Sequence, residues 1–523
     1  MKKIFLIYAL PVFMILAATG CKKSFQDLTV NNNVPNAVPA SLLFNGILNS
    51  MADMPDGSDE TYSQYYINNY DYYGNNRYDF GSGDNYYNTL KNVVAMEDQA
   101  VKGGAAAVNP YSALGKFFRA YFFSKMSMEE GDIPMTDALK GLTNLTPAYD
   151  TQKTVMTQSL AWLESANTDL TSLIAAGNTT LAGDIYLGNS LTAWQKVVNT
   201  FRIRLLLQLS KKTADIDVIA QFAAIVGNPT KYPVMTSATD NLQYTFVSPT
   251  NYYPQTPDNF GQSGSRKNTS ATYIGLLTSL KDPRVFVTAE PARYNVDDLK
   301  QSATAFTSFI GADPGLDLGV MYNNAGLQKY SFLNRKRYYS TYTGEPSIQI
   351  GYPELMFNIA EGINRGWATG NAEDYYTKGI QASFASYSIP NTGSFTAYFY
   401  RPGSTNVATI TNYDTYTINV DWATYYAQSA VKYTADAAGL TKILQQKYLA
   451  LFRHSGLESY FTYRRTGVPN FTTGPGTGNG SRIASRFQYP QSERTSNADN
   501  YKKALASQFG GNDDINGVMW ILK

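Results

Sequence analysis

Apolar side chains recur at helical spacing along much of this chain, and this periodicity limits the folds that it can adopt. Residues three or four positions apart lie on one face of an α-helix, so such stripes predict amphipathic helices packed around a core. The clearest stripe follows Gly188 and comprises Leu191, Trp194, Val198, Phe201, Leu205 and Leu209. Comparable stripes predict helices over residues 86–101, 113–128, 156–170, 355–363, 372–387 and 441–460.

Capping signals indicate where several of these helices begin. Asn109 followed by Pro110 is typical of an N-cap with proline at the first helical position. Asp150 is a second candidate cap, for the helix that carries Met156. Ser41 is a third, for a short helix that runs through Met51.

Two helices around Gly370-Asn371 are expected to form a hairpin. The first carries Leu355 and ends near Gly366, and the second begins at Ala372. Small residues at Ala360, Gly379 and Ala382 permit the two helices to approach closely. This arrangement resembles a tetratricopeptide-type hairpin, although the chain shows no clean period of about 34 residues.

Two long stretches, 240–345 and 391–436, lack clear periodicity and are rich in Pro, Gly, Tyr, Ser and Thr. Such composition is typical of loops. We expect only a short helix over 271–280 and short strands at Gln243–Val247 and Arg284–Val287. The sequence therefore predicts a mainly all-α fold, in one large domain over residues 41–523 with long loop insertions and a few short β-strands.

The N-terminus has the order of a secretory signal. Lys2 and Lys3 precede an apolar run that contains Pro11 and is shorter than the ~20 residues needed to span a membrane. Small residues then lead to Cys21, the only cysteine among 523 residues. This pattern resembles the lipobox of bacterial lipoproteins. We predict a signal peptide over 1–20, acylation (palmitate) of Cys21 and a flexible leader over 21–40; an ordinary signal peptide with a nearby Cys is the alternative.

Charge and the rarity of Cys and His exclude several classes of function. The chain carries 43 basic and 41 acidic residues without a basic cluster, which gives no electrostatic footprint for nucleic acid. One Cys excludes a disulfide framework and a thiolate zinc site. His454 is the only histidine and is expected on a helix, so neither a His-based metal site nor a catalytic triad is indicated. We predict no cofactor and no metal.

Several segments together resemble the SusD/RagB family of outer-membrane lipoproteins, and most closely its SusD-like nutrient-binding branch. The similarity runs in order through ASLLFNGIL at 40–48, GDIPMTDALKG at 131–141, AWQKVVNTFRIRLLLQLS at 193–210, YPELMFNIAEGINRG at 352–366 and YFTYRRTGVPNF at 460–471. Each motif is short and mostly structural, but their order is preserved over nearly the whole chain.

The resemblance implies a fold of four tetratricopeptide-like hairpins whose loop insertions carry a ligand site. It also implies a lipid-anchored protein at the outer membrane, facing the cell surface. Its implied partner is a SusC-like TonB-dependent transporter, over which it closes as a lid. Ligands in such a family are mainly glycans, with peptides in some members.

Tyrosine supplies the candidate ligand contacts. The chain holds 41 Tyr, 26 Phe and 5 Trp. A sugar has apolar C–H faces and a rim of hydroxyl groups, so its site needs aromatic planes flanked by polar side chains. The segment 62–80 offers this mixture. We predict ligand contacts from Tyr65, Tyr66, Tyr70, Asp71, Tyr72, Tyr73, Asn75, Arg77, Tyr252, Tyr253, Trp367 and Trp422. The alternative for each ring is packing in the core.

Two other functions stay open at this level. A surface glycoside hydrolase would use two carboxylates from separate elements, which the sequence does not single out. A structural scaffold of the cell envelope would need no ligand site. The predicted function is non-enzymatic binding of a glycan or peptide and its delivery to the transporter.

Overall fold

The computed structural model describes residues 38–523, in which helices account for most of the regular structure. The predicted signal peptide, Cys21 and most of the leader lie outside these residues. The prediction of a mainly all-α fold with a few short strands is confirmed. Within the described residues, no helix combines the length and the apolar character needed to cross a lipid bilayer.

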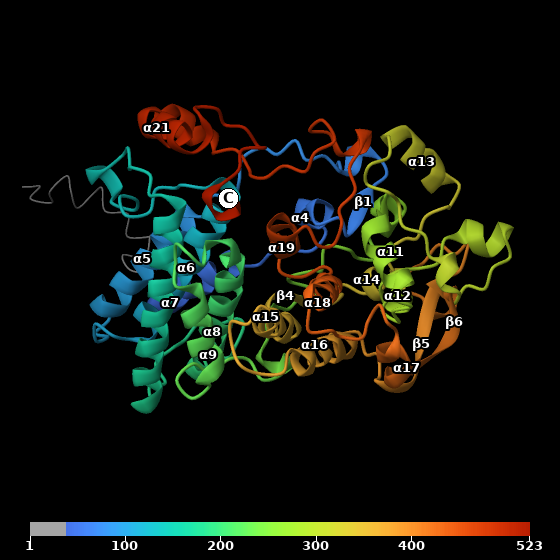
Figure 1. Ribbon diagram of the computed structural model, residues 1–523, viewed down its shortest axis with the longest axis horizontal. Helices are drawn as coiled ribbons and strands as arrows, with labels where there is room; N and C mark the ends of the chain where they lie inside the picture. Colours follow the sequence, from blue (N-terminus) through green and yellow to red (C-terminus); the bar gives the residue numbers. More distant parts are fainter. Residues whose placement is uncertain (1–37) are drawn as a thin grey trace, which may run out of the picture.

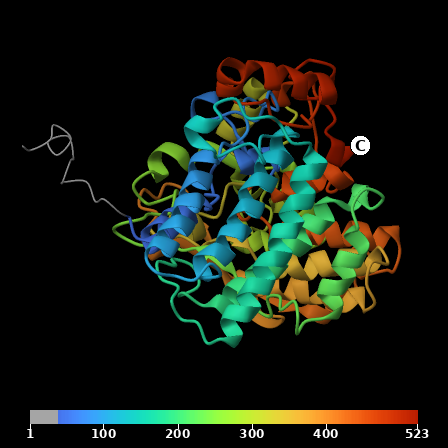
Figure 2. The same ribbon diagram turned by 90° about the vertical axis from the view of Figure 1, so that its left-hand side faces the viewer.

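The N-terminal part is a stack of helices in which each packs against the next (Figures 1 and 2). Their apolar faces meet in one large core around Trp194, Phe117 and Phe44. These helices are α3 (Ala40–Ser50), α5 (Tyr87–Lys102), α6 (Pro110–Glu130), α7 (Gln152–Ala175), α8 (Leu191–Gln208) and α9 (Val218–Gly227). The short helix α4 (Ser58–Tyr62) lies apart from this stack and packs against residues 66–68.

Local signals explain some helix starts and not others. Asn109 caps α6 by accepting from the N–H groups of Tyr111 and Ser112, as predicted. Asp150 does not cap α7, because Thr151 takes that place; Asp150 instead accepts from the N–H groups of Met135 and Thr136. Ser41 is not a cap either, since α3 already begins at Ala40 after Pro39.

The middle part of the chain builds the other half of the molecule, to the right in Figure 1, around a second core that includes Tyr273, Phe384 and Phe452. The C-terminal segment returns to the side of the N-terminal helices, where Leu505 and Ile521 join the first core. The helices that follow α9 are α10 (Phe260–Ser263), α11 (Ala271–Ser279), α12 (Val285–Thr288), α13 (Leu318–Gly326), α14 (Arg335–Tyr338), α15 (Tyr352–Asn364), α16 (Ala372–Ser386), α17 (Trp422–Ala427), α18 (Ala437–Ala450), α19 (Glu458–Thr466), α20 (Gln491–Ser496) and α21 (Ala498–Phe509).

In residues 38–523, six strands form three antiparallel two-stranded sheets. The strands are β1 (Tyr66–Asn68), β2 (Leu242–Tyr244), β3 (Lys267–Thr269), β4 (Ser347–Ile350), β5 (Thr392–Tyr400) and β6 (Tyr413–Asp421). β1 pairs with β3, β2 with β4, and β5 with β6 in a register that joins Thr392 to Asp421 and Tyr400 to Tyr413.

Two predictions for the irregular stretches are wrong. The β5–β6 hairpin lies where 391–436 was expected to be loop, because its Tyr- and Thr-rich strands share their composition with loops. Residues 284–287 were expected to be a strand, but Val285–Thr288 form the helical turn α12, in which Val285 and Phe286 are buried against the second core. The short helix over 271–280 and a strand near Gln243 are found as α11 and β2.

The predicted hairpin around Gly370-Asn371 is formed by α15 and α16, which pack directly on each other. Gly379 lets the helices approach, since a Cβ atom there would lie 2.8 Å from the Phe357 ring. On the α15 side, a Cβ atom at Gly362 would lie 2.1 Å from the ring of Phe222 on α9. Glycine is therefore required at both positions because there is no space for a side chain, and not because of the backbone conformation.

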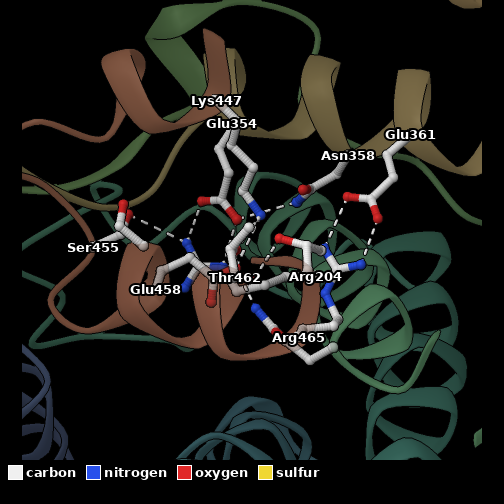
Figure 3. Close-up of polar contacts among 12 residues, drawn as sticks. Arg204, Glu354, Asn358, Glu361, Lys447, Ser455, Glu458, Thr462 and Arg465 are labelled. Atoms are coloured by element: carbon white, nitrogen blue, oxygen red, sulfur yellow. Dashed lines mark hydrogen bonds and ion pairs between the residues drawn. The ribbon is translucent and has the colours of Figure 1, made fainter. Parts of the chain in front are cut away.

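Buried ion pairs join α8, α15, α18 and α19 where the two halves meet (Figure 3). Arg204 of α8 forms a bidentate pair with Glu354 of α15 and also donates to the Gln349 carbonyl, 2.8 Å away. Two further pairs reach α19: Arg465 binds both carboxylate oxygens of Glu361 at 2.5 and 2.9 Å, and Lys447 lies 3.0 Å from Glu458. Every charge in this network is buried and has a hydrogen-bonding partner, the condition under which a buried pair is tolerated.

Glu361→Gln tests the contribution of this network to stability. Although burial opposes its charge, Arg465 and then Arg365 hold the pKa of Glu361 at about 2, below its usual 4.5. Between these pH values the unfolded chain binds more protons, so the free energy of unfolding falls as the pH drops from 4.5 towards 2. We expect the variant to lose about 3 kcal/mol at pH 7 and to show a flatter stability curve below pH 4.5.

Urea unfolding followed by circular dichroism at pH 7, 4.5 and 3 measures this effect. Asp374→Asn, at an exposed carboxylate on α16, is the matched control and should leave the curve unchanged. Equal stability of wild type and Glu361→Gln at pH 7 would contradict the assigned role.

Candidate functional site

The loop over residues 70–75 follows β1, and hydrogen bonds of asparagine side chains fix its two ends. The N–H group of Asn68 donates to Asn76 Oδ1, and Asn76 Nδ2 donates back to the Asn68 carbonyl, both at 2.8 Å. Asn69 fixes the start of the loop, because its Nδ2 donates to the Ser265 carbonyl and to Asn268 Oδ1. Residues 70–75 are therefore displayed on a fixed base rather than packed beneath it.

Three tyrosines meet at this loop, and we call Tyr70, Tyr72 and Tyr322 the tyrosine platform. Tyr70 is 40% exposed, Tyr72 81% and Tyr322 45%. The ring centroids of Tyr70 and Tyr322 lie 5.6 Å apart at 39°, and those of Tyr70 and Tyr72 lie 6.5 Å apart at 31°. The guanidinium of Arg266 lies 5.1 Å from the Tyr70 ring centroid. The platform is thus a set of inclined, partly exposed aromatic rings with a cation at one side.

Tyr322 reaches the platform from α13, more than two hundred residues later in the chain. Asp317 caps α13 by accepting from the N–H groups of Gly319 and Val320. Met321 turns inward to a small core with Ile67 and Ala312, and Tyr322 follows it on the outer face. Packing Met321 beside β1 is what places Tyr322 next to Tyr70.

A cavity of about 470 Å³ opens beside the platform. Arg266, amide side chains and apolar groups form its wall, a combination suited to a ligand with hydroxyl groups and apolar faces. The described residues that line it include no Asp or Glu, so the wall carries no pair of carboxylates for acid–base chemistry. The lining residues are Asn69, Ser265, Arg266, Tyr322, Asn323, Ala325, Gly326, Leu327, Gln328 and Phe332.

Two of the tyrosines predicted at the site are core residues, which corrects that prediction. Tyr65 is 1% exposed, stacks on Tyr448 and donates to the Tyr448 carbonyl at 2.7 Å. Tyr66 is 2% exposed and donates to the Gly57 carbonyl at 2.9 Å. Burial raises the pKa of both hydroxyl groups well above the usual 10.0. Neither ring has a face left for a ligand.

The candidates from later segments also divide between core and surface. Tyr253 and Trp367 are buried, one with its hydroxyl on Arg453 and the other against Phe222, so these predictions are corrected in the same way. Tyr252 is exposed and pairs with Tyr342, with ring centroids 4.8 Å apart. Trp422 is half-buried and stacks on Tyr426 at 5.4 Å. Neither Tyr252 nor Trp422 lines the cavity beside the platform.

The polar candidates lie around the platform. Asp71 and Asn75 are exposed on the loop, and Asn75 accepts from the N–H group of Arg77. Arg77 is exposed but pairs with Asp79 at 2.6 Å. Tyr73 lies in the short helical turn Asp71–Tyr73, and its side chain is outside the described part.

Sequence reasoning missed Tyr322 and Arg266. The segment MYNNAG around Tyr322 repeats the Tyr–Asn mixture of the predicted segment, and this was the available signal. Arg266 had no such signal, because only the pairing of β1 with β3 brings it beside Tyr70.

His454 is not on a helix, contrary to prediction, because α18 ends at Ala450 and α19 begins at Glu458. Burial lowers its pKa from 6.5 to about 4, so it is neutral at pH 7. Its Nδ1 accepts from the N–H group of Ile348 at 3.4 Å, a structural contact.

Comparison with known proteins assigns the chain to a family. A family model described as "Starch-binding associating with outer membrane" matches residues 31–490, and the chain belongs to this SusD-like family. A SusD homologue from Bacteroides fragilis is 30% identical, with 93% of this chain and 100% of that one covered and a TM-score of 0.78. An outer-membrane protein from Bacteroides vulgatus is also 30% identical, with the same coverage and a TM-score of 0.77.

A chitin-binding SusD homologue from Flavobacterium johnsoniae shares the fold at 22% identity, with 92% of this chain and 98% of that one covered and a TM-score of 0.69. No curated protein matches the chain significantly. The chain is therefore a member of a family described as starch-binding and associated with the outer membrane, and the relative from Bacteroides vulgatus is described as involved in nutrient binding.

Proposed function

We propose that this protein binds a neutral glycan on the tyrosine platform and presents it for uptake across the outer membrane. The observation that carries the proposal is that Tyr322, which lines the cavity, adjoins the ring of Tyr70, and that Tyr70 in turn adjoins Tyr72. Aromatic faces stack on the apolar faces of sugar rings, while amide and guanidinium groups donate to their hydroxyls.

A glycan suits this surface better than a peptide or a catalytic substrate. The rings are inclined to one another, as successive sugar units of a chain would require, and β1 and β3 are short strands already paired with each other. Because the cavity wall has no carboxylate, the geometry gives no support to the hydrolase alternative. The family description names starch and one relative is described as chitin-binding, which agrees with a polysaccharide ligand.

The second part of the proposal concerns the partner and the anchor. Cys21 carries the lipid, and the leader up to residue 40 tethers the body to the outer membrane, on its outer face. The tether keeps the protein at high local concentration beside a SusC-like TonB-dependent transporter, over which it acts as a lid. The lipid supplies proximity, and the platform supplies specificity.

Tyr322→Ala should weaken glycan binding without unfolding the protein. Removing one exposed stacking ring costs about 1–2 kcal/mol of binding free energy, or roughly 5- to 30-fold in Kd. A glycan array selects the ligand, and isothermal titration of the best oligosaccharide measures the change. Tyr72→Ala should act in the same direction.

Tyr252→Ala is the matched control, since Tyr252 is 44% exposed and also stands beside another tyrosine. It should leave Kd unchanged. Loss of binding in Tyr252→Ala with none in Tyr322→Ala would move the site to the Tyr252–Tyr342 pair. Absence of saturable binding to any glycan would favour a structural role.

Cys21→Ser should release the protein from the outer membrane while leaving its melting temperature unchanged, because the described cores are built from residues from Ala40 onward. Membrane fractionation with immunoblotting measures the first effect. Co-purification of a TonB-dependent transporter with wild type but not with the variant is the expected second result. A variant that still fractionates with the outer membrane would contradict the lipid anchor.

A further inference from the structure

A second cavity, of about 430 Å³, lies between the end of α19 and the C-terminal segment, and we call it the Arg464 cavity. It shares no lining residue with the cavity at the tyrosine platform. Its wall holds two arginines, three hydroxyl side chains and an aromatic pair. The lining residues are Tyr463, Arg464, Gly467, Phe471, Thr473, Ser481, Arg482, Ile483, Ala484, Ser485 and Leu522.

Arg464 is a partly buried arginine that has no carboxylate partner within the described residues. Its two terminal nitrogens donate to the carbonyls of Ser485 and Met128, each at 2.7 Å, and its Nε is buried without a partner. By contrast, Arg465 pairs with Glu361 and Arg486 with Asp513. Carbonyl oxygens satisfy hydrogen bonds but do not neutralise the charge of a guanidinium.

The nearest acidic groups do not supply the missing charge. Glu458 is occupied by Lys447, at 3.0 Å, and by Gln208. Glu129 accepts from the N–H group of Asp84, and burial raises its pKa well above 4.5, which favours its neutral form. Burial in turn lowers the pKa of Arg464 from its usual 12.5, the expected result for a cation taken from water without a counter-charge.

Arg482 adds a second cation to the same wall. It is exposed, and its Nε donates to the Asn479 carbonyl at 3.3 Å. No ion pair joins it to a carboxylate in residues 38–523. Two guanidinium groups and three hydroxyl side chains in one wall supply the charge and the donors that an oxyanion needs, since Arg binds oxyanions through paired N–H groups.

An apolar surface completes the wall. Tyr463 and Phe471 stack with ring centroids 4.1 Å apart at 5°, and Tyr463 is partly exposed. A free anion gains nothing from contact with such an apolar surface, whereas the apolar face of a sugar ring that carries the anionic group can pack against it.

We propose that the Arg464 cavity is a second binding site, which takes an oxyanion in the form of a carboxylate or sulfate group of the kind that acidic sugars carry. Its two arginines receive the anionic group, and Tyr463 lies against the ring that bears it. The site is independent of the tyrosine platform. It would extend the ligands of this protein to polysaccharides with acidic units.

Titration calorimetry of the purified full-length protein at low ionic strength and pH 7 tests this. The probes are sodium glucuronate, sodium sulfate and glucose, the last being the neutral counterpart of the first. Saturable binding of glucuronate that glucose does not reproduce is the expected result, and a higher salt concentration should weaken it. Binding of sulfate as tight as that of glucuronate would assign the site to the anion alone, which still supports the oxyanion site.

Arg482→Gln should weaken anion binding at least tenfold and leave the melting temperature unchanged, because Arg482 is exposed. Arg401→Gln, an exposed arginine paired with Asp414 outside this cavity, is the control and should have no effect. Arg464→Lys keeps the positive charge but removes the paired N–H groups of the guanidinium, so we expect an affinity for the anion between those of wild type and Arg482→Gln.

The outcome is separable from that of the proposed glycan site. Tyr322→Ala should retain anion binding, and Arg482→Gln should retain binding of a neutral glycan. No saturable binding of either anion to wild type, or equal binding by wild type and Arg482→Gln, would overturn the proposal.

Discussion

The buried ion pairs at the junction of α8, α15, α18 and α19 are the constraint on which the rest of the structure depends. Removing a charge from water costs several kcal/mol, so Arg204, Glu361 and Arg465 are tolerated only while their partners hold them in bidentate geometry. That requirement fixes the spacing of the helices at the boundary of the two cores. Tyr65, the residue before β1, ties that strand to the same helices, because its hydroxyl contacts Ser459 of α19 and the Tyr448 carbonyl of α18.

Helices were predictable wherever a long apolar stripe runs along them, whether one face is buried, as in α5, or nearly the whole surface, as in α6 and α8. α5, α6 and α8 follow their apolar stripes closely, and Asn109 caps α6 as its sequence indicates. The β5–β6 hairpin was missed because the first four residues of β5 are exposed or half-exposed and its Thr- and Tyr-rich composition is that of a loop, although Tyr416, Ile418 and Val420 alternate with polar residues in β6. The segment of α12 was expected to be a strand, because a β-branched run favours one. Burial of Val285 and Phe286 against the second core stabilises a helical turn there instead.

The candidate site shows why composition finds a segment but not its contacts. Tyr65, Tyr66, Tyr70 and Tyr72 stand within eight residues, yet the first two are buried and the last two exposed. The boundary is set by the local Asn68–Asn76 hydrogen bonds and by the Asn69–Asn268 hydrogen bond, and the second of these depends on a strand far away in sequence. Tyr322 joins them only through the tertiary packing of Met321, a contact that no local pattern encodes.

Together these features describe a rigid helical body with a platform for a sugar chain and a cationic cavity at a separate place. The central claim is that the ligand lies on the tyrosine platform. A crystal structure of the protein with the tightest-binding neutral oligosaccharide tests it most directly. The account predicts sugar rings stacked on Tyr72, Tyr70 and Tyr322, with hydroxyl groups in reach of Arg266; an oligosaccharide bound elsewhere, with the platform bare, would contradict it.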